Sequence, residues 1–199
     1  KKNVTDDFSQ IHITMKPTGV YHEALAHFLH DHGCIVNLIN PARLPKFAAY
    51  KGFVHKNVRG DSKLLALFGT ENPQERWLPE SKSIRELKAK LARLEALKGD
   101  LLRENNRLEQ AEATESPSEV MLSIHHIRKA LNEAIALLKK DINDHINGNP
   151  ELKSDKKLLE SIPGVGDVVA NQMLVVYHSK NFKKASEMAA FLGLIPKER

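Results

Sequence analysis

A repeating apolar pattern between Ser83 and Ile146 constrains the fold of this chain more than any other feature. Its first part recurs every three or four residues, which is the pattern of a coiled-coil helix. Read as heptads, the a positions are Ile84, Leu91, Lys98 and Asn105, and the d positions are Leu87, Leu94, Leu101 and Leu108. Polar residues at a positions lower stability, but they can fix the register and the number of helices in the bundle.

A second helical run follows a break at Glu115–Ser118, which contains a proline. The segment Asn147–Pro150 ends this run, because Gly and Pro do not continue a helix. Two long helices with a short turn must either lie antiparallel or pair with another copy. The sequence therefore predicts a helical stalk between two smaller segments. The apolar positions of the second run are Leu122, Ile124, Ile127, Leu131, Ile135, Leu138, Ile142 and Ile146.

The composition is that of a folded protein. The 199 residues are 41% hydrophobic and 28% charged, and no apolar run reaches the roughly 18 residues that span a membrane. The only cysteine, Cys34, excludes an internal disulfide and a multi-cysteine zinc site, and it favours a reducing, cytoplasmic setting. The net charge of +5 is compatible with nucleic-acid binding. The chain starts at Lys1 without a methionine, so we expect a processed chain or a fragment.

The N-terminal segment has the pattern of a βαβ unit. Ile11–Met15 and Cys34–Ile39 are predicted strands, and Tyr21–Asp31 is an amphipathic helix between them. The crossover between two parallel strands should be right-handed. Further helices are predicted up to Tyr50 and over Asp61–Phe68. Since two strands do not make a stable sheet alone, the head must borrow strands or lack part of its domain.

Three blocks of this head resemble the DEDD transposases of bacterial insertion sequences, the RuvC-like family that includes RNA-guided bridge recombinases. The blocks are Met15–Tyr21, Val36–Pro41 and Lys56–Ser62. In that family four acidic residues hold magnesium on an RNase H-like fold, where the metal positions and activates the reacting oxygens. The resemblance implies a transposase that cuts and joins DNA in transposition, with Mg²⁺ as its cofactor.

The resemblance fails at the acidic positions themselves. The family glutamate falls on Lys16, and the first aspartate of the family's Asp-x-x-Asp pair falls on Val58. Asp61 is the surviving acidic residue, and the remaining family aspartate is expected upstream of Lys1. A hard divalent cation needs several oxygen ligands, and Lys16 adds a positive charge where the metal should lie. We therefore expect a degenerate, catalytically inactive copy.

Two other metal sites are possible in this head. A rearranged site could combine Asp61 with Glu23 or Asp31. A zinc site could use histidines, because imidazoles spaced three apart on a helix can share a metal. The histidines concerned cluster around Cys34 and are His22, His27, His30 and His32.

The linker and the stalk also resemble this family. Trp77 and Pro79 precede a serine N-cap at Ser81 or Ser83, and family members continue here into a coiled coil that dimerises and holds nucleic acid. The stalk charges fit either a solvated helix face or an RNA-binding face. The apolar seam predicts a homodimer or a higher oligomer. The basic residues of the first stalk helix include Lys88, Lys90, Arg93, Lys98, Arg103 and Arg107.

The C-terminal segment has a helix-hairpin-helix pattern. Helices are predicted over Ser154–Ser161 and Val168–Tyr177, the second with Asp167 as its N-cap. Between them lies Pro-Gly-Val-Gly, whose glycines permit positive φ and bring backbone N–H groups close to a phosphate. The motif predicts sequence-independent binding of the DNA backbone, and the alternative is a tight turn with no ligand. The predicted contacts are Gly164, Val165 and Gly166.

Two further blocks, Ser161–Gly166 and Ala189–Pro196, resemble the second conserved domain of the family. In active members a nucleophilic serine follows the last of these blocks. The chain stops at Arg199, before that position. The serines that do not align with the nucleophile are Ser161, Ser179 and Ser186.

Together these patterns predict a mainly α protein with a partial α/β head. The expected parts are an incomplete RNase H-like (RuvC-like) domain at 1–80, antiparallel coiled-coil helices at 81–149, and a truncated helix-hairpin-helix domain at 150–199. The expected partners are DNA and, as the RNA-guided members of the family imply, a guide RNA, with Lys56 and Arg59 as further nucleic-acid contacts. Two alternatives remain: a nucleic-acid-binding dimer that inhibits intact transposase, and a decayed fragment without function.

Overall fold

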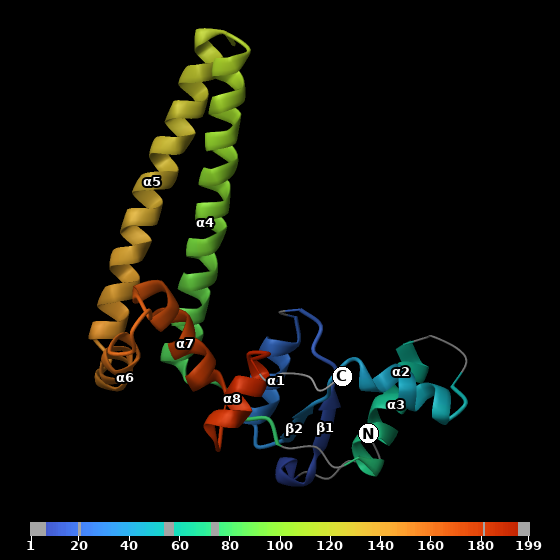
Figure 1. Cartoon of the computed structure of the whole chain (residues 1–199). Coiled ribbons are helices and arrows are strands. Elements are labelled where there is room, and N and C mark those ends of the chain that lie inside the picture. The colour runs from blue at the N-terminus through green and yellow to red at the C-terminus, as the bar shows by residue number, and fades with distance from the viewer. Residues whose placement is uncertain (1–6, 20, 54–57, 73–75, 181, 195–199) are drawn as a thin grey trace. The chain divides into compact units, whose positions relative to one another are not determined.

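The computed structural model describes residues 7–19, 21–53, 58–72, 76–180 and 182–194. They form two compact units, Lys1–Pro79 and Glu80–Arg199, each of which is described by itself (Figure 1). Within the described residues, no helix is both long and apolar enough to cross a membrane.

The first unit begins with the predicted βαβ arrangement. Strands β1 (His12–Met15) and β2 (Ile35–Leu38) pair in parallel, with His12 opposite Ile35, and helix α1 (Tyr21–Asp31) connects them. Gly33 ends α1 with a φ of 88°, a left-handed conformation that suits glycine. The strand–helix–strand prediction is therefore confirmed, and α1 has the predicted bounds.

Two more helices complete the first unit. Helix α2 (Arg43–Tyr50) and helix α3 (Val58–Glu71) pack around a small core. Helix α3 also lies against β1 so closely that a Cβ at Gly69 would be 2.0 Å from Thr14 Oγ1. Glycine is needed at this position because any side chain would collide with the strand. The buried core residues are Ile39, Leu44, Leu64 and Phe68.

The segment after α3 contacts the sheet and α1. The backbone N–H of Trp77 donates a hydrogen bond of 2.8 Å to the carbonyl of Val36. The Trp77 ring lies edge-on to the rings of His27 and His30, with centroid distances of 5.0 and 6.0 Å. This segment therefore covers part of a small sheet that two strands alone would leave exposed.

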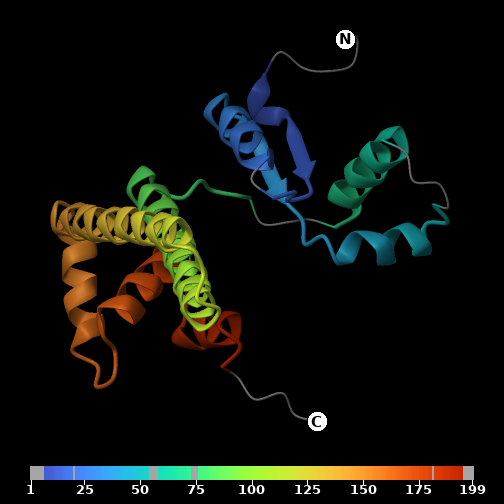
Figure 2. The same cartoon turned by 90° about the horizontal axis from the view of Figure 1, so that it is seen from above.

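The second unit is built on the predicted stalk. Helix α4 (Lys82–Ala113) and helix α5 (Ser118–Asn147) run antiparallel, as Figures 1 and 2 show. The turn between them contains Glu115, a non-glycine residue with a φ of 48°. The predicted pair of antiparallel helices and the position of their break are confirmed.

The seam of the stalk departs from the predicted heptads near its middle. Leu97 is buried, with 5% of its surface exposed, whereas the predicted a residue Lys98 is half-buried and pairs with Glu95. An α-helix has 3.6 residues per turn, so a strict 3.5-residue register drifts along its length. The predicted a residue Asn105 is exposed, and it accepts a hydrogen bond of 2.7 Å from Arg128 Nε of α5. Because α5 fills the seam, the apolar pattern does not require a second chain.

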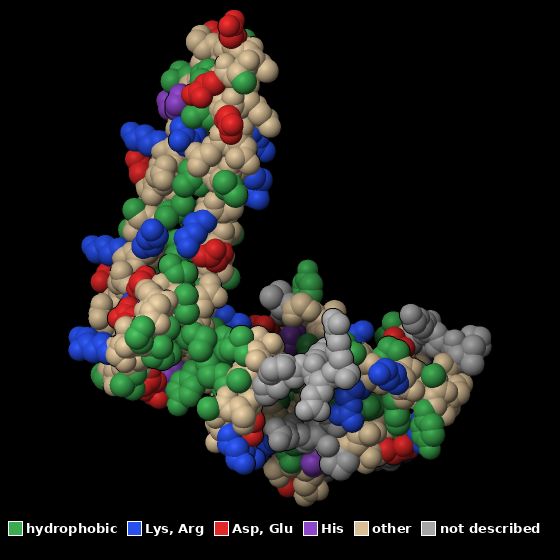
Figure 3. Space-filling model, viewed as in Figure 1, with side chains coloured by type: hydrophobic (Ala, Val, Ile, Leu, Met, Phe, Trp, Pro, Cys, Tyr) green, Lys and Arg blue, Asp and Glu red, His purple; other side chains and the backbone are tan. Residues whose placement is uncertain are grey.

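The last helices join the base of the stalk. Asn149 caps helix α6 (Pro150–Glu160), a short loop leads into helix α7 (Asp167–Ser179), and helix α8 (Ala185–Phe191) follows. Leu152 and Leu174 are buried in the same core as the stalk leucines. In Figure 3 apolar side chains gather around this base. The domain boundary that the sequence predicts near residue 150 falls between α5 and α6, which belong to the same compact unit.

Candidate nucleic-acid interface and acidic positions

In the described residues of the first unit, the side chains at the family's acidic positions are not gathered into a metal site. Lys16 follows β1 and is exposed, Val58 begins α3 with 86% of its surface exposed, and Asp61 is exposed in the first turn of α3. A carboxylate in that turn has a structural role of its own, because it stabilises the helix dipole. Within the described chain, Asp61 belongs to no group of three possible metal ligands. These side chains therefore do not fit Mg²⁺, which needs several oxygen ligands.

The acidic residues proposed for a rearranged site are not brought to Asp61. Glu23 lies in the first turn of α1 and Asp31 is its last residue, and both are exposed. Among the residues that the structure describes, neither forms a three-ligand group with Asp61. Another acidic residue of this unit, Asp7, caps a short 3₁₀ helix, Phe8–Gln10. The hydrogen bond from the Ser9 hydroxyl lowers the pKa of the Asp7 carboxyl group.

The histidines of the first unit make packing and capping contacts. His27 and His30 contact the Trp77 ring, while His22 Nδ1 donates to the carbonyl of Gly19 at 2.8 Å. His32 Nδ1 donates to the backbone in the same way, to the carbonyl of Phe28 at 2.7 Å. In the described part of this unit these side chains do not gather into a group of three ligands, so nothing in the arrangement favours zinc here.

A short loop with two glycines joins α6 to α7 where the sequence predicts the hairpin. Gly164 has a φ of 87°, as its role in the turn requires, and Val165 N donates to the carbonyl of Ile162 at 3.0 Å. Gly166 has an ordinary φ of −93° and is the N-cap of α7. The prediction that Asp167 is the N-cap is wrong, because Asp167 is the first residue of the helix itself.

Asp167 changes the electrostatics of the hairpin. Its carboxylate forms an ion pair with Lys156 of α6, whose side chain is only 14% exposed and also lies 3.7 Å from Glu160. The N-terminus of a helix attracts anions through its N–H groups and its dipole. Here the chain's own carboxylate lies where a phosphate would approach, and Lys156 is already neutralised.

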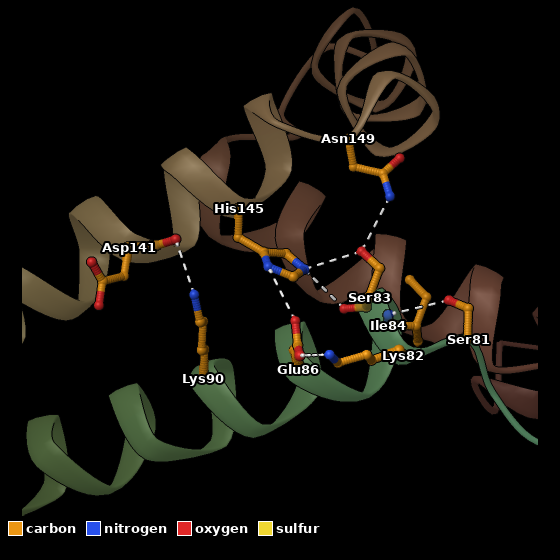
Figure 4. Close-up of polar contacts among 9 residues, drawn as sticks. All are labelled: Ser81, Lys82, Ser83, Ile84, Glu86, Lys90, Asp141, His145 and Asn149. Atoms are coloured by element: carbon orange, nitrogen blue, oxygen red, sulfur yellow. Dashed lines mark hydrogen bonds and ion pairs between the residues drawn. The ribbon is translucent and has the colours of Figure 1, made fainter.

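A polar cluster at the base of the stalk has the composition of a Ser-His-acid triad (Figure 4). His145 Nε2 lies 3.1 Å from Ser83 Oγ and 2.9 Å from the Ser83 carbonyl, and Nδ1 lies 3.8 Å from Glu86. A carbonyl can only accept, so Nε2 carries its proton and cannot take one from the Ser83 hydroxyl. The Asn149 amide also donates to Ser83 Oγ, at 3.2 Å. The cluster is a clamp between α4 and α5, and Ser81 is the N-cap of α4.

Comparison with known proteins assigns the family. A family model described as transposase, of the DEDD IS110 type, matches residues 1–111. A second model, described as the transposase IS116/IS110/IS902 family, matches residues 156–199. The first match alone covers more than half of the chain. This chain belongs to the IS110-type transposase family.

Two curated relatives match nearly the whole chain. The pilin gene-inverting protein of Moraxella lacunata is 31% identical over 190 residues, and that of Moraxella bovis is 30% identical over the same length. The match covers 95% of this chain and 58% of each relative. The chain therefore spans less than two thirds of the length of these IS110-type relatives.

The predicted contact residues fall within the two family matches. Lys16, Val58, Asp61 and Arg59 lie in the first IS110-family match, and the hairpin glycines lie in the second. Arg59 is exposed in the first turn of α3, whereas Lys56 lies outside the described residues. The roles of these residues in nucleic-acid binding remain predictions. The Lys156–Asp167 ion pair was not predicted, although the sequence has an acidic residue directly after the second hairpin glycine.

The prediction that the hairpin binds DNA has a direct consequence for Asp167, whose replacement should then strengthen binding. We expect Asp167→Asn to lower the dissociation constant for duplex DNA about twofold to fivefold at low salt, since a charge at a helix terminus contributes about 0.3–1 kcal/mol. Fluorescence anisotropy with a labelled duplex measures this. Glu133→Gln is the control, because it removes one negative charge from an exposed residue of α5 that lies outside the hairpin. Equal effects of the two substitutions would show that the hairpin does not face phosphate.

Proposed function

We propose that this IS110-family chain binds DNA in a recombination or transposition reaction without cutting and joining strands itself. The observation that carries the proposal is the chemistry of the family's acidic positions. They hold Lys16 and Val58, and Asp61 has no second and third ligand in the described structure. Two relatives are named for inverting a pilin gene, which supports DNA as the partner of this chain.

The proposed function involves no metal-dependent cleavage of DNA by this chain. In the family, bound Mg²⁺ ions stabilise the attacking and leaving oxygens of a phosphodiester. An ammonium group at the end of β1 and an isopropyl group at the start of α3 supply no oxygen ligand. The function therefore depends on holding nucleic acid.

The hairpin is a better candidate for that contact than the stalk. Several basic side chains of the stalk already pair with acidic ones. This favours the interpretation that the charged stalk residues form a solvated helix face and not an RNA-binding face. Acidic and basic side chains are also interspersed along the stalk in Figure 3. At the hairpin Lys156 is paired as well, but Gly164 and Gly166 expose backbone next to a helix N-terminus, which can meet a phosphate without a free cation. The paired side chains are Lys88 with Glu80, Lys98 with Glu95, Arg103 with Asp100, and Arg107 with Glu104.

A strand-transfer assay with restored acids tests the catalytic part of the proposal. We expect no strand transfer from the chain or from the double variant Lys16→Glu, Val58→Asp in the presence of Mg²⁺, because both positions are exposed and the new carboxylates would stay hydrated instead of enclosing a metal ion. Denaturing gels with a labelled duplex give the readout. Activity of the double variant would refute this account, and activity of the unmodified chain would show that another site exists.

A gel-shift titration at two salt concentrations tests the binding part separately. Duplex DNA and structured RNA serve as the two probes, because the family includes RNA-guided members. Phosphate contacts release counterions, so the shift should weaken steeply as salt rises. No shift with either probe would remove the binding function and leave a fragment without function.

A second candidate is an inhibitor that assembles with intact transposase. Leu102 and Leu137 favour it, because they remain 61% and 64% exposed on the stalk. Each of these leucines could bury its side chain against the stalk of another chain, which would remove apolar surface from water. Light scattering of the purified chain, alone and mixed with an intact IS110-type transposase, distinguishes a monomer from such an assembly.

A further inference from the structure

The second unit contains a cluster of potential metal ligands that lies outside the family's acidic positions. Glu151 and Asp155 are one turn apart on α6, and His178 lies near the end of α7. One donor atom from each residue lies within 4.8 Å of the others, which makes this a group of three possible ligands in the described part of the chain. The side chains are 75%, 27% and 14% exposed, respectively. The cluster therefore consists of a nearly buried imidazole between two carboxylates.

The contacts of His178 determine which nitrogen carries the proton. Nε2 lies 2.9 Å from Asp155 Oδ2, and a carboxylate only accepts, so Nε2–H is the donor. In a neutral imidazole Nδ1 then has a lone pair, and this lone pair lies 3.9 Å from Glu151 Oε1. Nδ1 and the Glu151 carboxylate are thus two donor atoms close enough to share one cation.

The geometry suits a metal ion in two respects. Histidines that bind metals commonly donate their other ring N–H to a carboxylate, which is the arrangement of His178 and Asp155. Ligands bound to one tetrahedral zinc at about 2.0–2.1 Å lie about 3.3 Å apart. The distance of 3.9 Å between Nδ1 and Oε1 requires only a small movement of the exposed Glu151 side chain.

We propose that Glu151 and His178 bind a divalent transition-metal ion such as Zn²⁺, with Asp155 orienting the imidazole. Imidazole and carboxylate together suit zinc better than magnesium, which prefers oxygen ligands alone. The ion joins α6 to α7 at the ends away from the hairpin turn, so it holds the two helices of the hairpin together. This site does not depend on the proposed DNA-binding function.

Zinc titration of the full chain tests the site. The chain is prepared without a polyhistidine tag, treated with a chelator and dialysed, and then titrated with ZnCl₂ by calorimetry and by thermal unfolding. We expect one ion per chain and a rise in the unfolding temperature of the second unit, since a ligand that binds the folded state stabilises it. MgCl₂ at the same concentration should cause no such rise.

Three variants distinguish this site from adventitious binding. Glu151→Gln alters an exposed side chain, so it should fold and should weaken zinc binding more than about tenfold, while Asp155→Asn should weaken it about 10- to 100-fold. His125→Gln removes an exposed histidine of α5 and should bind as tightly as the unmodified chain. The proposal fails if zinc causes no shift in the unfolding temperature. It also fails if Glu151→Gln and His125→Gln bind zinc equally.

Discussion

Truncation of Leu174 should destabilise the second unit more than any other substitution proposed for this unit. Leu174 of α7 is fully buried, and it packs in the core that Ile84 and Leu87 of α4 also form. We expect Leu174→Ala to lower the free energy of unfolding by about 2–5 kcal/mol, because the substitution removes buried surface and leaves a cavity. Chemical denaturation followed by far-ultraviolet circular dichroism measures the loss.

Leu158→Ala provides the matched control for this expectation. Leu158 is a leucine of the neighbouring helix α6, but 66% of its surface is exposed. Its truncation should change the free energy of unfolding by no more than about 0.5 kcal/mol. Similar losses for the two leucines would mean that α7 does not pack on the base of the stalk. The hairpin would then be a separate element.

Replacement of Gly69 by alanine should destabilise the first unit. The new Cβ would lie 2.0 Å from Thr14 Oγ1 and 3.1 Å from Thr14 Cβ, so rotation of the threonine side chain cannot relieve both contacts. We expect Gly69→Ala to lower the free energy of unfolding by about 1–3 kcal/mol, the usual cost of overpacking. Trp77, the only tryptophan, belongs to this unit, so its fluorescence reports the unfolding.

Gly99→Ala is a control with the opposite expected sign. Gly99 lies within α4, and an added Cβ would meet only Arg103 Nη1, at an ordinary 3.7 Å. Alanine favours the helix by about 1 kcal/mol over glycine, so the second unit should gain stability. If Gly69→Ala also stabilises its unit, α3 does not approach β1 as closely as the structure shows.

Local patterns predicted much of this fold. The bounds of α1, the parallel strand pair and the long antiparallel helices all follow from periodicity and from turn residues such as Gly33 and Pro117. These signals lie within a few residues of one another, so they can be read along the chain. The family was also readable, because its motifs are contiguous blocks.

Contacts between distant residues could not be predicted in this way. The burial of Leu97 in place of Lys98 depends on how far α4 rotates against α5. The clamp joins Ser83 to His145, 62 positions apart, and the metal-ligand cluster joins Asp155 to His178, 23 positions apart.

Signals between neighbouring residues were enough to predict the helices and the strand pair. Which side chains meet depends on the tertiary structure. It places Asp167 beside Lys156, which changes the charge at the hairpin, and His178 between two carboxylates. The physical reason is that helix formation depends on neighbouring residues, whereas an ion pair or a ligand set depends on how helices pack.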